Sequence, residues 1–110
     1  MDLQHLVVFC TCSDRATAER IAKAIVTERL GACVNILPGI TSVYRWQDEV
    51  HSDSEQLLLI KTRRNVYPAL ENRIRDLHPY DVPEIIALPI QHGAAEYLAW
   101  LDASLADSQS

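Results

Sequence analysis

The stretch HPYDVPEIIALPI, residues 78–90, decides how the second half of the chain folds. Pro79 and Pro83 keep the residue before each of them out of the helical region. An apolar run with strand character, 85–90, follows directly. The stretch therefore predicts a helix that ends at His78, a rigid connection with polar side chains, and then a strand. Such a connection suits a functional site, and it also fits a simple helix stop followed by a turn.

The segments before and after this stretch complete a recognisable order of elements. The apolar run 6–10 predicts a central strand. Apolar residues at helical spacing then predict a helix that is capped by Ser13 or Asp14 and ends with Gly31 in the C′ position. The other predicted elements are strands over 32–37, 40–46 and 57–62, a hairpin tip over 47–54, a helix capped by Asn65, and a last helix over 94–105. This βαββαβ order with a terminal helix predicts an α+β, ferredoxin-like fold with helices on one face of an antiparallel sheet.

Size and charge narrow the class of protein. A chain of 110 residues is expected to form a single domain, 1–110. The net charge of −5, without a basic block, argues against nucleic acid as a partner. The run 6–10 is too short for a signal peptide or a membrane span. Three cysteines without a secretion signal indicate free thiols, so we expect a cytoplasmic protein with no membrane partner.

The predicted hairpin is too long for the domain that carries it. Strand over 32–46 would span about 50 Å, whereas a domain of this size is roughly 35 Å across. The strand must therefore bend at Pro38-Gly39 or project beyond the core. A projecting hairpin would expose Tyr44, Trp46 and free strand edges. These features predict a homo-oligomer.

The cysteines offer the clearest chemistry. Cys10 and Cys12 lie on the same face if the first strand persists to Cys12, and two sulfurs there could hold a soft metal such as Cu(I). Buried cysteine is also an ordinary core residue, and Cys12 fits a spacer role at the start of a loop. Cys33 fits the core. The chain has no Cys-x-x-Cys loop, zinc-ligand pair, phosphate loop or nucleophile motif, so no enzyme is predicted.

Several segments, taken together, resemble the CutA divalent-cation tolerance family. They follow one another along nearly the whole chain: VVFCT at 7–11, ACVNILPG at 32–39, SVYRW at 42–46, KT at 61–62, HPY at 78–80, PE at 83–84 and YLAW at 97–100. The resemblance implies a ferredoxin-like subunit that assembles through its sheet edges as a tight homotrimer, cytoplasmic in bacteria.

The resemblance also implies a copper site. Cys10 and His78 match positions proposed as copper ligands in bacterial members of the family, and Glu84, which matches a nearby glutamate of the family, is the candidate third ligand. Leu77 stands where those members have a further histidine, which implies a weaker copper site in this chain. Asp48-Glu49 replaces a glycine that is common at the hairpin tip, and we expect this change to alter the turn and not the fold.

Three functions compete at this point. The first is a trimeric, non-enzymatic protein of copper binding and divalent-cation tolerance, since thiolate and imidazole together suit copper. The second is a trimeric small-ligand sensor resembling the PII signalling proteins, with an apolar cleft between subunits. The third is a structural or interaction trimer, in which aromatic residues serve the interface. The residues that would line the cleft of the sensor, or serve the interface of the structural trimer, are Tyr44, Trp46, Tyr80 and Trp100.

Overall fold

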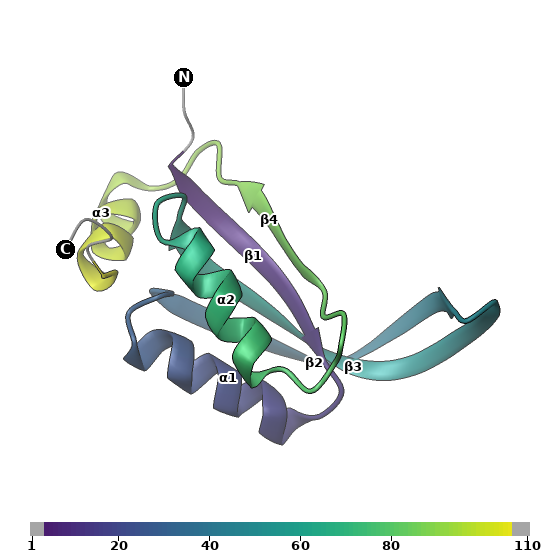
Figure 1. Ribbon diagram of the computed structural model, residues 1–110. Helices are drawn as coiled ribbons and strands as arrows, with labels where there is room; N and C mark the ends of the chain where they lie inside the picture. Colours follow the sequence, from purple (N-terminus) through teal and green to yellow (C-terminus); the bar gives the residue numbers. More distant parts are fainter. Residues whose placement is uncertain (1–3, 107–110) are drawn as a thin grey trace.

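The computed structural model describes residues 4–106 and has the predicted order of elements. These are β1 (His5–Cys12), α1 (Arg15–Thr27), β2 (Cys33–Trp46), β3 (Glu49–Arg63), α2 (Tyr67–Leu77), β4 (Ile85–Pro89) and α3 (Ala95–Ser104). The strands form one sheet in the order β2-β3-β1-β4, and every neighbouring pair is antiparallel. Helices α1 and α2 lie side by side over one face of the sheet, and α3 lies at one end (Figure 1). This is the predicted βαββαβ arrangement with a terminal helix.

The core lies between the sheet and its two covering helices. Alternate residues of the central strands β1 and β3 face the helices, as the two-residue period of a strand requires. They meet the apolar stripes that α1 and α2 present at helical spacing. The largest of these fully buried side chains are Val8, Leu58, Ile60, Ile21, Ile25, Leu70 and Ile74. This packing fixes the end of β1 against the end of α2, where the candidate site lies.

The opposite face of the sheet is apolar as well. The intervening residues of β1, β3 and β4 point there, and the register pairs Val7 with Leu88 and Phe9 with Ile86. Ile86 and Leu88 are 52% and 48% exposed in the single chain. We call this the open face and define it by six residues: Val7, Phe9, Leu57, Leu59, Ile86 and Leu88. Neither α1 nor α2 covers it.

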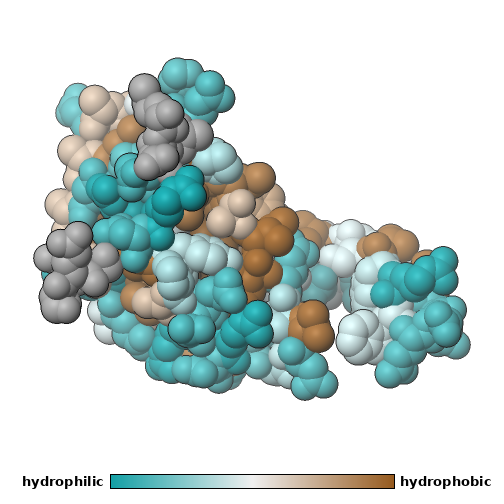
Figure 2. Space-filling view, turned by 45° about the horizontal axis from the view of Figure 1, so that its top comes forward, coloured by the Kyte–Doolittle hydropathy of each residue, from teal (hydrophilic) through white to brown (hydrophobic). Residues whose placement is uncertain are grey.

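The hairpin of β2 and β3 projects from the body. The two strands change register between Leu37 and Ile40, where Gly39 has a φ of 74°. Beyond this bulge, residues 41–54 form an arm whose side chains are all exposed or half-buried. The molecule is consequently elongated, 43 × 25 × 22 Å, and Figure 2 shows the arm standing clear of the body with both apolar and polar side chains. Of the two predicted alternatives, a bend at Pro38-Gly39 or a projection beyond the core, the structure shows a projection with its bulge at that site.

The predicted tip over 47–54 was too long. Trp46 pairs with Glu49, so the turn consists of Gln47 and Asp48 alone. Both have positive φ, 52° and 64°, as a two-residue type I′ turn requires. The polar residues 49–54 that follow are part of β3. A strand in the arm does not pack against the core, so it does not require an apolar face.

Asp48→Gly should stabilise the hairpin. Glycine adopts positive φ without the steric penalty of a Cβ, and we expect the free energy of unfolding to rise by about 1 kcal/mol. The measurement is the urea midpoint at a fixed protein concentration. Glu49→Gly is the matched control, since glycine within a strand should lower the midpoint. Equal losses in both variants would contradict the turn assignment.

The helix ends also differ from the prediction. Helix α1 ends at Thr27, and Arg29, not Gly31, has the left-handed backbone, with a φ of 62°. The Arg29 guanidinium donates to the carbonyl oxygens of Ser104 and Ala103 at the end of α3. A Cβ on Gly31 would lie 2.8 Å from the Cγ2 atoms of both Ile25 and Ile60. Gly31 is therefore required by close packing and not by the helix cap.

The start of α2 is set by packing too. Val66, which is 2% exposed, takes the N-cap position that we predicted for Asn65. Its side chain cannot cap the helix, but Pro68 in the first turn leaves one N–H fewer to satisfy. No helix within residues 4–106 is long and apolar enough to cross a membrane.

Candidate metal centre

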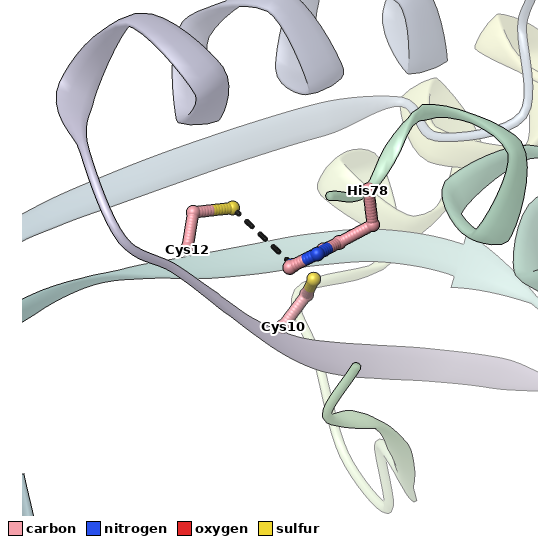
Figure 3. A group of neighbouring side chains, drawn as sticks. All are labelled: Cys10, Cys12 and His78. Carbon is pink, nitrogen blue, oxygen red and sulfur yellow. Dashed lines mark hydrogen bonds between the residues drawn. The ribbon is translucent and has the colours of Figure 1, made fainter. Parts of the chain in front are cut away.

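The end of β1 and the end of α2 bring two thiols and an imidazole together. Cys10 and Cys12 are among the last residues of β1, and His78 is the C-cap of α2. Pro79 holds His78 in the extended region, with φ −82° and ψ 135°, so its side chain turns away from the helix. The ligand atoms of these three buried residues all lie within 4.8 Å of one another (Figure 3). The structure thus brings the predicted residues Cys10 and His78 together.

Cys12 is the member for which the sequence favoured a spacer role, although its pairing with Cys10 was considered. The first strand persists to Cys12, and its side chain is fully buried like that of Cys10. Its Sγ lies 3.9 Å from His78 Nε2. Its position at the loop suggested a spacer, but the structure directs the Cys12 side chain into the same cluster as Cys10. The i, i+2 spacing of the two cysteines was the available signal.

Both ring nitrogens of His78 are engaged. Nε2 lies 2.7 Å from the carbonyl oxygen of Thr11, which can only accept, so Nε2 must carry the proton. The backbone N–H of Tyr80 donates to Nδ1 at 3.2 Å, so Nδ1 must be bare. The two bonds fix the same tautomer. Losing a buried bond of this kind costs about 1–3 kcal/mol, and the ring, which is 7% exposed, is held firmly.

The two thiols share a hydrogen bond that separates their acidities. The bond to Cys12 raises the pKa of Cys10, and burial raises it further. The same bond lowers the pKa of Cys12 below its usual value. Cys12 is therefore the more acidic thiol of the pair, and the Cys10 thiol also donates a long bond of 3.9 Å to the carbonyl oxygen of Thr11. A thiolate is the form of cysteine that binds metals.

A cavity of about 670 Å³ lies beside this cluster. Its lining residues are Thr11, Ser42, Val43, Tyr44, Trp46, Glu55, Tyr80, Asp81, Val82, Pro83 and Glu84. Glu55 is 7% exposed and accepts a hydrogen bond of 2.7 Å from the Tyr80 hydroxyl. Burial raises the pKa of Tyr80, and the Glu55 carboxylate raises it further. Thr11 lines the cavity, and its carbonyl oxygen accepts the hydrogen bond of His78 Nε2. The same residue therefore contacts both the cavity and the cluster.

The remaining predicted residues fall in two places. Glu84 is exposed and lines the cavity, and it is not part of the group formed by the two cysteines and His78. Tyr44, Trp46 and Tyr80 line the same cavity. Trp100 lies on α3, with its ring centroid 5.5 Å from that of Tyr97, outside the cavity lining. Within one chain the structure therefore groups three of the four predicted aromatic residues.

Comparison with known proteins gives close relatives along nearly the whole chain. Residues 6–104 match the family model of the CutA1 divalent ion tolerance protein. A divalent-cation tolerance protein CutA of Thermus thermophilus is 58% identical over 95 residues, which are 86% of this chain and 92% of that protein. The human protein CutA is 47% identical over 93 residues, 84% of this chain but 52% of that protein. The chain thus spans about half the length of the human relative.

Solved structures agree with these sequence matches. A Thermus thermophilus divalent cation tolerance protein superimposes with a TM-score of 0.91 at 54% identity, covering 93% of this chain and 99% of that one. CutA1 from Oryza sativa gives a TM-score of 0.93 at 46% identity, covering 96% of both chains. The sequence matches and the common fold lead to one conclusion: this chain belongs to the CutA1 divalent ion tolerance protein family.

Proposed function

We propose that the protein is a non-enzymatic, copper-binding protein of cation tolerance that works as a homotrimer in the cytoplasm. The observation that carries this proposal is the buried group of Cys10, Cys12 and His78, whose ligand atoms lie within 4.8 Å of one another. Soft thiolate ligands favour copper over hard cations such as Mg²⁺ and Ca²⁺. The names of the relatives, which describe divalent-cation tolerance, support the same assignment.

The charges around the cluster suit a cation. Glu55, Asp81 and Glu84 line the neighbouring cavity, and acidic groups along a cleft raise the local concentration of cations. The negative net charge of the chain acts in the same direction. In this proposal Glu84, a candidate ligand in the sequence analysis, contributes to the negative charge of the neighbouring cavity and is not itself a ligand.

The open face and the arm support the homotrimer. An apolar sheet face with exposed Ile86 and Leu88 is unfavourable in water, and covering it by other copies of the chain removes that cost. The arm likewise exposes Val43, Tyr44 and Trp46. Both features belong to the sheet, so subunits can meet through sheet faces and edges.

The cavity favours a second candidate function, a small-ligand sensor. Its volume of about 670 Å³ is within the range of small-molecule sites, and Tyr44, Trp46 and Tyr80 give it an aromatic lining. A ligand bound there would stabilise the protein against unfolding without any need for Cys10. A trimer with neither activity, serving only as a structural or interaction module, is the third reading.

The Cys10→Ser variant tests the copper proposal. We expect reduced, metal-free protein to bind one copper ion per chain in an anaerobic calorimetric titration, and we expect Cys10→Ser to abolish the saturable heat. Binding should weaken in acid, since the thiol ligands must lose their protons. The control is Cys33→Ser, which changes a half-buried thiol of β2 outside the group of three.

Three results would count against the assignment. The same heat in the wild type and in Cys10→Ser would exclude Cys10 as a ligand. No saturable heat in the wild type would exclude copper binding, and a search for ligands of the cavity would replace it. If neither copper nor a small ligand bound to an intact trimer, the third function, a structural or interaction trimer, would be favoured.

A further inference from the structure

The hydrogen bonds of His78 decide which groups are free to bind a metal ion. A neutral imidazole binds a metal through a nitrogen that carries no proton. His78 Nε2 is the nitrogen nearest the sulfurs, and its proton is committed to the carbonyl oxygen of Thr11, 2.7 Å away. Moving that proton to Nδ1 would direct it at the backbone N–H of Tyr80, which now donates to Nδ1. Ligation through Nε2 would therefore break both bonds at once.

The two cysteines are less restricted: the Cys10 thiol donates a long bond of 3.9 Å to the carbonyl oxygen of Thr11, which is given up when the thiol loses its proton. Both side chains are fully buried, and no other metal-ligating group among residues 4–106 joins them and His78 in the cluster. Zn²⁺ in structural sites requires four ligands, and Cu²⁺ prefers tetragonal sites with nitrogen and oxygen ligands. Two thiolates on one strand face, in a dry pocket, satisfy neither ion. They suit a soft monovalent ion, and thiolates select Cu(I) among the biological metals.

The His78 imidazole then acts as a hydrogen-bond donor and not as a metal ligand. The Nε2 atom of His78 lies 3.9 Å from Cys12 Sγ as well as close to the Thr11 carbonyl, and Figure 3 shows the ring directed at the space between the two cysteines. Two thiolates and one monovalent ion leave a net negative charge in a buried site. The Nε2–H of His78 keeps its short bond to the Thr11 carbonyl and makes a second, longer one of 3.9 Å to Cys12 Sγ. Its dipole stabilises the charge on the sulfur, as groups outside the metal's own shell commonly do.

We infer that Cys10 and Cys12 alone bind one Cu(I) as a two-coordinate dithiolate, and that His78 is a hydrogen-bond donor to this site and not a ligand. The inference deepens the proposed function and rests on it. It assigns the monovalent oxidation state to a protein whose family is described by divalent ions. It also makes Cys12, rather than His78 or Glu84, the second ligand.

The test is an anaerobic competition titration with Cu(I) and a chromogenic Cu(I) chelator. We expect the wild type and Cys33→Ser to bind equally, and Cys10→Ser and Cys12→Ser to lose measurable binding. His78→Gln keeps an N–H donor and should weaken binding by about tenfold, in the range of changes to groups outside the shell. His78→Leu has no donor and should weaken binding further. X-ray absorption of the Cu(I)-loaded wild type should show two sulfur atoms around copper and no imidazole.

Each contrary outcome has a separate meaning. Imidazole scattering in the wild type would overturn the inference, and so would complete loss of binding in His78→Gln with an unchanged circular dichroism spectrum. Loss in Cys10→Ser with normal binding in Cys12→Ser would overturn it too, while the proposed copper function stood. A wild type that binds no Cu(I) would overturn the function and the inference together.

Discussion

Replacing Ile25 with alanine should lower the free energy of unfolding by about 3 kcal/mol, the usual range for deleting a fully buried isoleucine side chain. Ile25 is on the buried stripe of α1 and has no exposed surface. Its Cγ2 faces the backbone of Gly31, where α1 and β3 approach closely, so the surrounding structure has little freedom to fill the space. The measurement is urea unfolding, with both proteins at the same concentration because assembly contributes to stability.

Val26→Ala is the matched control for this prediction. Val26 is the next residue of the same helix and is 42% exposed, so its truncation should change the stability by less than about 0.5 kcal/mol. Gly31→Ala adds a test of the packing. Its methyl group should be destabilising in the wild type and less so in the Ile25→Ala background, since part of the obstruction is gone there. Equal costs of Gly31→Ala in both backgrounds would contradict the close approach.

Two acidic substitutions on the open face, Ile86→Asp and Leu88→Asp together, should convert the proposed homotrimer into monomers. Both side chains are about half exposed in the single chain, so the fold can accept the change. An interface over this face would have to bury two carboxylates per chain without partners, at a cost of several kcal/mol. Sedimentation equilibrium should show the mass of three chains for the wild type and of one chain for the variant, with the same circular dichroism spectrum.

A variant with the same added charge elsewhere completes this experiment. Ala69→Asp with Asn72→Asp places two carboxylates on exposed positions of α2, and the wild-type mass should persist. A trimer that survived Ile86→Asp with Leu88→Asp would show that the open face is not the interface. A wild type that sediments as a monomer would contradict the homotrimer itself.

The order of elements could be predicted because local signals determine it. Prolines end α2 and delimit the connection to β4, and apolar spacing marks the helices. The misplaced boundaries have tertiary causes. Gly31 looked like a helix cap, but its lack of a side chain serves contact with Ile25 and Ile60, which no local pattern reveals. Residues 49–54 looked like a loop because strands in the arm pack against no core and need no apolar alternation.

The candidate site was predictable only in part. Its two halves are 66 residues apart in the sequence between Cys12 and His78, and the resemblance, not spacing, connected Cys10 with His78. Cys12 depended on whether β1 extends to residue 12, and strand ends cannot be placed that finely from sequence. The partners of His78 are the backbone carbonyl of Thr11 and the backbone N–H of Tyr80. Backbone carbonyl and N–H groups occur at nearly every position of a chain, so no sequence motif predicts which of them will contact His78.

The bulge between Leu37 and Ile40 divides the hairpin into a part that packs in the body and the projecting arm. Every side chain of the buried core belongs to the body, and residues 41–54 contribute none. In the proposed homotrimer, substitutions in the arm should therefore change how tightly subunits bind one another while the tertiary structure of each subunit persists. If the arm serves that assembly, folding and association can be altered separately within one chain, because a substitution in residues 41–54 removes no side chain from the buried core.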